Sequence, residues 1–164
     1  MPVPPKFIVD AMLGSTARKL RILGFDTLYF KDGGDADLEA IGRTERRIIL
    51  TSDKSLFAHS LRVGNRAILV GGSSDRTRLL SILGQAGPEM VQRSGRLESR
   101  CAVCNGALEV LKRSSAAKEK IPPKVLARHR LFFRCTWCSK MYWRGGHWER
   151  IRRLSSSLWT KALT

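Results

Sequence analysis

The sequence predicts an α/β protein in which a parallel sheet of about four strands, with helices on both faces, precedes a small second module. Three observations predict this arrangement. Short β-like runs alternate with helical stretches over residues 1–87, as in parallel sheets. All four cysteines lie after residue 100, in two C-x-x-C pairs. The charge also changes there, because residues 1–98 carry 15 Lys/Arg and 11 Asp/Glu whereas residues 99–164 carry 15 and 3.

The first part begins with a buried strand at residues 6–10 and a helix over 12–23 that ends at Gly24. Further strands are expected at 27–30, 47–51 and 67–70, and helices at 35–43, 53–61 and 75–83, the last ending at Gly84. We expect a first domain over residues 1–87, a linker over 88–98, the second module over 99–148 and a C-terminal helix over 149–164. In that helix Ile151, Leu154 and Leu158 recur at helical spacing, which is typical of a helix that packs on the body or docks a partner.

Composition places this chain of 164 residues among globular proteins with polyanionic partners. Apolar residues make up 43% and the formal net charge is +16. The sequence has no apolar run of transmembrane length and no signal-peptide pattern, so we expect a cytoplasmic protein with no membrane partner. So positive a charge favours nucleic acid, through release of counterions from phosphates. The plain alternative is a basic protein that its charge keeps in solution.

The cysteines predict one structural metal site. Cys101 and Cys104 form one pair, Cys135 and Cys138 the other, and 30 residues separate the pairs. The two pairs can bind the same Zn²⁺, each from a tight turn. In the first turn Asn105-Gly106 supplies residues that tolerate positive φ. Two disulfides or a redox pair are the alternatives, but nothing marks the chain as secreted or thioredoxin-like. Four thiolates leave no open coordination position, so this zinc would fold the module and not catalyse a reaction.

The module between and after the two pairs mixes cations with aromatic rings. This mixture offers phosphate contacts and stacking surfaces for unpaired bases, although some of the rings must form the core of so small a module. The candidate contacts to nucleic acid are Lys124, Arg128, Arg130, Arg134, Tyr142, Trp143, Arg144 and His147. A DNA-binding zinc protein would use the same charge, but no helix-turn-helix or finger spacing is present.

Aspartates gather where the expected parallel strands end. Asp10 ends the first strand, Asp53 follows the third, and Asp35 and Asp37 open the helix after the second. Ligands bind beyond the carboxyl ends of such strands, and clustered carboxylates favour a hard cation such as Mg²⁺ or Mn²⁺. The alternative is helix capping, which suits Asp35 and Asp53; Asp10 would cap a helix only if one began at Ala11 or Met12.

Several segments resemble the PIN-like Mut-seven C-terminal RNase domain family, whose members carry a zinc ribbon after the nuclease part. The resemblance covers nearly the whole chain. In the first part it rests on residues 7–14, 17–27 and 47–56; in the second it rests on residues 100–106, Pro122-Pro123, residues 135–138 and residues 142–147. Lys19 and Ser15-Thr16 depart from the family pattern.

The resemblance implies a PIN-like three-layer domain whose acids bind divalent metal and hydrolyse RNA. It implies catalytic roles for Asp10, Asp37 and Asp53, with Asp35 able to replace Asp37 and Asp75 as a candidate fourth acid. Arg18 and Arg21, one turn apart on the first helix, would contact the RNA backbone or pair with the acids.

The expected function is therefore a Mg²⁺- or Mn²⁺-dependent endoribonuclease with a basic, RNA-binding zinc ribbon, and ribosomal or transfer RNA are candidate partners. The alternative is a non-catalytic RNA- or ribosome-binding factor that uses the same fold as a scaffold.

Overall fold

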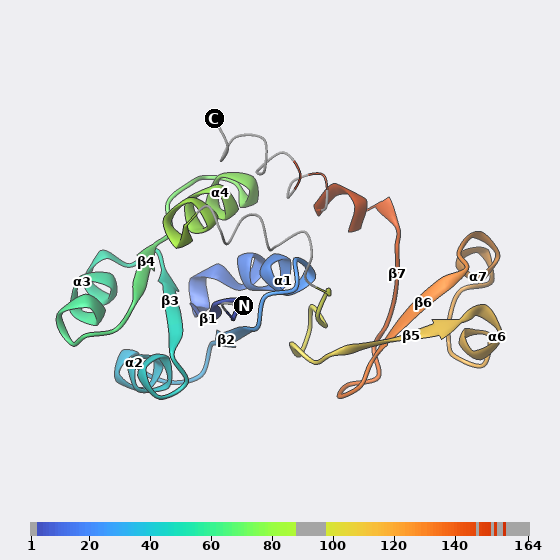
Figure 1. The fold of residues 1–164 in the computed structure, drawn as a ribbon, viewed down its shortest axis with the longest axis horizontal. Helices are drawn as coiled ribbons and strands as arrows, with labels where there is room; N and C mark the ends of the chain where they lie inside the picture. The colour runs from blue at the N-terminus through green and yellow to red at the C-terminus, as the bar shows by residue number, and fades with distance from the viewer. Residues whose placement is uncertain (1–2, 88–97, 147, 152, 154–155, 157–164) are drawn as a thin grey trace.

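The computed structural model describes residues 3–87, 98–146, 148–151, 153 and 156. It confirms the predicted α/β class, with a four-stranded parallel sheet followed by a three-stranded antiparallel sheet that carries the cysteines (Figure 1). Most of the predicted linker, residues 88–97, lies outside the described part. No helix in that part is both long and apolar enough to span a membrane.

The parallel sheet has the strand order β2-β1-β3-β4. Its strands are β1 (Lys6–Asp10), β2 (Thr27–Phe30), β3 (Arg47–Thr51) and β4 (Ala67–Leu69). Phe7, Ile8 and Val9 of β1 are fully buried, because a central parallel strand is covered on both faces. Asp10, at the end of β1, lies opposite Phe30 of β2, so the strand ends are in step at one edge of the sheet.

Two apolar clusters, one on each face of the sheet, hold the outer layers of helices against it. The helices are α1 (Gly14–Ile22), α2 (Asp35–Thr44), α3 (Lys54–Arg62) and α4 (Asp75–Ala86). Phe7 and Val9 pack with α1 and α4 on one face. Ile8 packs on the other face with Leu38 of α2 and Leu56 of α3, as the alternation of side chains along a strand requires.

Several element boundaries differ from the prediction by one to three residues. Residues Ala11–Leu13 form a 3₁₀ turn (η1) before α1 begins. Helix α1 ends as predicted, with Gly24 at a φ of +96°, a conformation that favours glycine. Helix α4 continues through Gly84 to Ala86, because Leu79, Ile82 and Leu83 keep it fixed in the core. Strand β4 ends one residue early, at Leu69.

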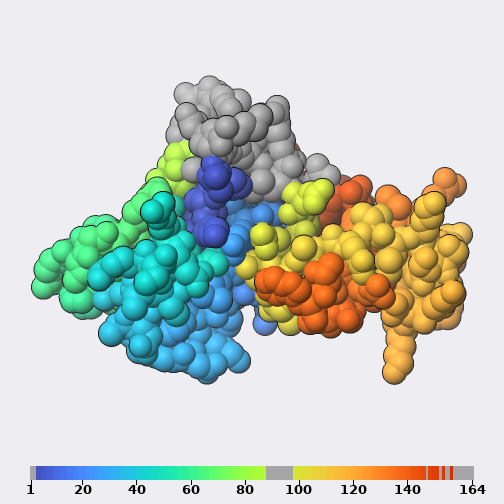
Figure 2. Space-filling view, turned by 60° about the horizontal axis from the view of Figure 1, so that its bottom comes forward, coloured from blue at the N-terminus to red at the C-terminus, as the bar shows by residue number. Residues whose placement is uncertain are grey.

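The second module is an antiparallel sheet in the order β5-β6-β7. It consists of β5 (Leu108–Lys112), α6 (Arg113–Ala116), α7 (Pro123–Arg128), β6 (Leu131–Cys135) and β7 (Met141–Trp143). The module forms a separate lobe beside the parallel-sheet domain (Figure 2).

After β7 the chain returns toward α4 (Figure 1), and residues 148–151 are helical. Ile151 is 2% exposed and joins the cluster of α1 and α4, so this part of the C-terminal helix packs on the body. Leu154 and Leu158 lie outside the described residues.

Candidate active site and metal centre

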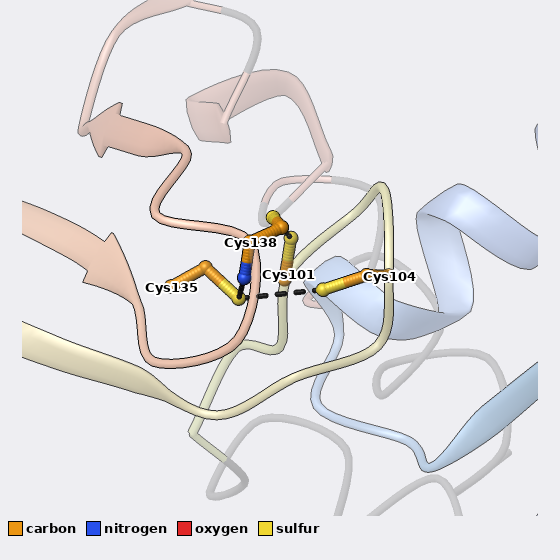
Figure 3. A group of neighbouring side chains, drawn as sticks. All are labelled: Cys101, Cys104, Cys135 and Cys138. Carbon is orange, nitrogen blue, oxygen red and sulfur yellow. Dashed lines mark hydrogen bonds between the residues drawn. The ribbon is translucent and has the colours of Figure 1, made fainter.

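The four cysteines converge from two turns. Their Sγ atoms lie within 4.8 Å of one another, with 3.6 Å between Cys101 and Cys138 and 3.4 Å between Cys104 and Cys135 (Figure 3). Tetrahedral zinc with Zn–S bonds of about 2.3 Å needs sulfurs separated by about 3.8 Å. The group therefore fits one Zn²⁺ in a closed four-thiolate site, as predicted.

Hydrogen bonds to sulfur favour the thiolate form of Cys101. Burial alone raises the pKa of this thiol, but the hydroxyl of Tyr142, 3.0 Å from Sγ, and the backbone of the turn lower the pKa to about 6. The backbone N–H groups of Trp137 and Cys138 donate to Cys135 Sγ. Tyr142, predicted to contact RNA, thus has its hydroxyl at the metal centre.

The turn after Cys104 differs in one detail from the prediction. Asn105 has the expected positive φ, +70°. Gly106 does not, but a Cβ built there would lie 2.8 Å from Cys135 Sγ and 3.0 Å from the Trp137 ring. Glycine is needed at this position because of close approach rather than backbone conformation.

The first cysteine turn docks on α1 and β2 through Arg21. This side chain is buried, and it donates to the carbonyls of Thr27, Ala102 and Val103 at 2.9, 3.0 and 2.9 Å. Burial lowers the pKa of Arg21, and Cys101 and Cys104 oppose that effect. The Arg21 guanidinium therefore joins β2 to the first cysteine turn, where the sequence predicted contact with RNA or pairing with the acids.

Asn105 makes a second contact between the modules. Its Oδ1 accepts from Thr27 N at 3.0 Å, and its Nδ2 donates to Asp26 Oδ1 at 2.8 Å. Asp26 also accepts from Arg47 at 2.8 Å. Burial alone raises the pKa of Asp26, but these bonds outweigh it and leave the pKa below its ordinary value. Sequence reasoning had assigned Asn105 only to the turn.

The carboxyl end of the sheet joins Asp10 to Asp53 through Thr51. The Thr51 hydroxyl donates to Asp10 Oδ2 at 2.9 Å and accepts from Asp53 N at 3.0 Å. Thr51 is fully buried, whereas Asp10 is half-buried and Asp53 is exposed. Sequence reasoning missed Thr51, although its position at the last residue of β3, beside two acids, was a usable signal.

Both aspartates also cap helices. Asp10 Oδ1 accepts from Ala11 N at 2.6 Å, because a 3₁₀ turn does begin at Ala11. Asp53 Oδ1 accepts from Ser55 N and Leu56 N at the start of α3. Capping takes one oxygen of each carboxylate, so Oδ2 of Asp53 and a lone pair of Asp10 Oδ2 are left for another ligand.

Asp35 and Asp37 open α2 after the end of β2, and both are exposed. Asp37 Oδ2 accepts from Gly34 N at 3.3 Å. Asp35 is the first helical residue and not the cap, which is Gly34. Within the part of the chain that the structure describes, the cysteines are the only group of three or more His, Cys, Asp or Glu ligands that could hold a metal ion. The acids do not form such a group.

Asp75 is already neutralised in the structure. It lies 2.7 Å from Lys19 Nζ and 2.7 Å from Ser15 Oγ, and these bonds hold its pKa below the ordinary value. Lys19 and Ser15 are two of the positions that depart from the family pattern. The residues that depart from the family pattern are therefore the ones that bond to the candidate fourth acid.

Some of the predicted RNA contacts are exposed, and one is already paired with carboxylates. Lys124, Arg128 and Arg130 are exposed around α7, and Arg18 is exposed on α1. Arg134 is paired with Glu109 at 2.7 Å and Glu119 at 3.1 Å.

The remaining predicted contacts are packed against rings, half-buried or outside the described residues. The Arg144 guanidinium lies over the rings of Phe133 and Trp148, at 5.5 and 4.8 Å from the ring centroids. Trp143 is half-buried, and His147 lies outside the described residues.

Comparison with known protein families gives one match. The model of the family described as the Mut7-C RNAse domain matches residues 5–155, which covers both the parallel-sheet domain and the cysteine module. No curated protein and no solved structure matches the chain.

Proposed function

Because the chain belongs to the Mut7-C RNAse domain family, we propose that it is a metal-dependent endoribonuclease whose acidic sheet edge cleaves RNA held by the basic zinc ribbon. The observation that carries this proposal is the Thr51 hydroxyl, which joins Asp10 to Asp53 at the ends of two adjacent strands. This hydroxyl orients the carboxylate of Asp10 and holds the backbone N–H of Asp53, and a hydroxyl that orients a carboxylate is a supporting arrangement typical of metal ligands.

Two carboxylates suit Mg²⁺ or Mn²⁺ even though no third acid joins them. Mg²⁺ keeps several waters and is commonly bound by one or two carboxylates plus substrate phosphates. Asp10 and Asp53 would hold the ion, and Asp35 or Asp37 would face it from the start of α2. The ion supplies an activated water and neutralises charge on the phosphate.

In this proposal the parallel-sheet domain carries the acids that hold the ion, and the ribbon carries the cations that bind RNA. Asp10 is held by Ala11 N and Thr51, and Asp53 by the first turn of α3, so both carboxylates are fixed before any ion arrives. The exposed cations of α7 would bind the RNA backbone. Arg21 and Asn105 hold the two modules together, so a strand bound on the ribbon would keep a fixed relation to the acids.

The test is cleavage of a labelled single-stranded RNA in Mn²⁺ by the full chain and by Asp10→Asn and Asp53→Asn. Asn caps helices about as well as Asp, so both variants can keep the capping oxygen and lose the charge, and Asp10→Asn also loses the oxygen that accepts from Thr51. We expect cleavage to fall by at least about 100-fold, as for loss of a charge-stabilising group. Asp32→Asn, in the exposed loop before α2, is the matched control and should cleave as the parent does.

One observation favours a second candidate, a non-catalytic RNA-binding factor. Lys19 and Ser15 occupy Asp75, so this candidate fourth acid is not free to complete a metal site. Salt-sensitive RNA binding without cleavage, by the parent and both variants alike, would favour this function over the nuclease.

A further inference from the structure

Trp137 is the exposed aromatic side chain of the ribbon. It lies in the second cysteine turn and is 70% exposed, and no other aromatic side chain is among the large exposed apolar residues in the described ranges. Full exposure of so large a ring in a small module is costly, because such modules have little apolar surface with which to build a core. A ring left outside therefore calls for an explanation.

The other rings of the ribbon are engaged. Phe132 is fully buried with His129 at its edge, Phe133 and Trp148 lie against Arg144, and Tyr142 contacts Cys101. These contacts show that the module can place aromatic rings in its core or on cations. A lack of suitable neighbours in the module therefore does not explain the exposure of Trp137.

One side of the Trp137 ring is supported. A Cβ built on Gly106 would lie 3.0 Å from Trp137 Cδ2 and 3.1 Å from Cγ, so the backbone of the first cysteine turn lies against the ring. Gly106 has no side chain to push the indole away. Contact with the backbone limits the rotamers of Trp137, and a ring already ordered loses less entropy on binding a partner.

The charge around the ring suits a polyanion. Residues 99–108 and 135–148, which carry the two cysteine turns, contain Arg100, Lys140 and Arg144 and no Asp or Glu. Lys140, three residues after Trp137, is exposed. An exposed aromatic ring in turns that carry cations and no carboxylates matches the surfaces that stack unpaired bases while neighbouring cations contact phosphates.

We propose that Trp137 is a stacking platform for an unpaired base, so that the ribbon selects single-stranded over double-stranded RNA. This proposal rests on the RNA binding of the ribbon proposed above and adds the class of RNA and the residue that selects it. Bases in a duplex are already stacked on both sides and cannot lie on the indole, whereas every unpaired base has a free face.

The experiment measures binding of the zinc-loaded full chain to a fluorescein-labelled 12-nucleotide RNA by anisotropy, with the strand single or in a duplex. The variants are Trp137→Leu, which keeps an apolar side chain on Gly106 without a ring face, and Trp137→Phe, which keeps a smaller ring. Val103→Ala is the matched control, because Val103 has the same place in the first cysteine turn and is 57% exposed. Zinc content and the thermal midpoint show whether each variant is folded.

We expect Trp137→Leu to weaken binding to the single strand by roughly 5- to 150-fold, the range measured for loss of one base–aromatic stack. Its salt dependence and its binding to the duplex should not change, because no phosphate contact is lost. Trp137→Phe should retain most of the affinity, and Val103→Ala all of it.

Equal single-strand affinity for Trp137→Leu and the parent would overturn this proposal and leave the proposed function standing. If folded Trp137→Leu lost the same affinity for the single strand and for the duplex, this proposal would also be overturned. Absence of RNA binding by the parent itself would instead contradict both this proposal and the RNA-binding part of the proposed function.

Discussion

Arg21 shows how the role of one residue depends on a distant segment. Its guanidinium contacts carbonyls 81 and 82 residues away along the chain. Its place on the buried face of α1 could be expected from helical spacing, but its partners could not. Sequence reasoning therefore offered the RNA backbone or the acids as partners of Arg21, although the side chain lies between two modules whose docking no local pattern encodes.

Replacing Arg21 should destabilise the protein and weaken its hold on zinc. Arg21→Met removes a buried cation that donates to three carbonyls, and we expect a loss of about 2–4 kcal/mol of unfolding free energy. Chemical denaturation and the rate of zinc transfer to a chromogenic chelator measure the two effects. Arg18→Met, one turn away and exposed, should change neither; similar losses for the two variants would contradict the assigned role.

The acidic edge was more predictable than Arg21. Asp10 and Asp53 end or follow buried strands, and adjacent parallel strands bring their ends together, so their place at one edge of the sheet followed from periodicity alone. The placement of Asp37 and Asp75 did not follow, because it depends on the loop after β2 and on side chains of α1. Thr51 was missed because a threonine at a strand end is usual.

At the scale of elements, the alternation of strands and helices was read correctly in the first domain. Apolar runs and helical stripes there are local signals. The strands of the ribbon were not predicted individually, since β5 and β6 pair across an insert with two helices. Their register depends on the metal centre and not on a nearby turn.

Helices α2 and α3 are joined by a buried carboxylate. Glu39 is 6% exposed and accepts from Ser60 Oγ at 2.8 Å, with His59 Nδ1 at 2.9 Å. Burial alone raises the pKa of Glu39, but the bonds from His59 and Ser60 outweigh it and lower the pKa. A lowered pKa means that the folded state favours the ionised carboxylate.

Glu39→Gln should reduce the free energy of unfolding by about 1–3 kcal/mol at pH 7. The contribution of ionised Glu39 is fully present above the ordinary Glu pKa of about 4.3 and is lost as the pH falls through the lower folded value. The difference between parent and variant should therefore shrink as the pH falls below about 4.3. Urea denaturation at several pH values checks this, with exposed Glu98→Gln as control; a difference independent of pH would contradict it.

The insert between β5 and β6 forms a basic element, the α6–α7 hairpin, defined as residues 112–130. It carries 7 Lys/Arg and 1 Glu, and that Glu119 is paired with Arg134. The exposed cations of this hairpin therefore face water and not carboxylates, which favours phosphate binding.

Removing Lys124, Arg128 and Arg130 together should weaken RNA binding and its salt dependence. Each phosphate contact to a single strand contributes about 0.7 to the slope of log affinity against log salt, so the triple alanine variant should lose about 2 from that slope. Anisotropy titrations from low to moderate salt measure it. The charge-matched control removes Lys6, Arg62 and Arg66, which are exposed on the parallel-sheet domain; an equal loss of slope there would show that only net charge matters.

At the scale of the whole molecule, the ribbon is attached at two places. Its first cysteine turn bonds to Arg21 and Thr27, and after β7 the chain returns so that Ile151 enters the core cluster of α1 and α4. The second module is thus built into the first one.

Zinc removal should therefore loosen the parallel sheet at one edge. β2 is an edge strand, and the amide of Thr27 donates to Asn105 of the cysteine turn. Without metal that turn loses its order, so Thr27 and Arg21 lose their partners while β4, the other edge, keeps its contacts. Hydrogen exchange by NMR, before and after chelation, should show Thr27 exchanging at least about 10-fold faster, as expected for loss of a bond worth about 1.4 kcal/mol. The amide of Val70, which donates to Thr51, is the internal control and should change little, and added Zn²⁺ should restore Thr27. If Thr27 stays protected in metal-free protein whose cysteine turns have collapsed, the two modules are not coupled through this contact.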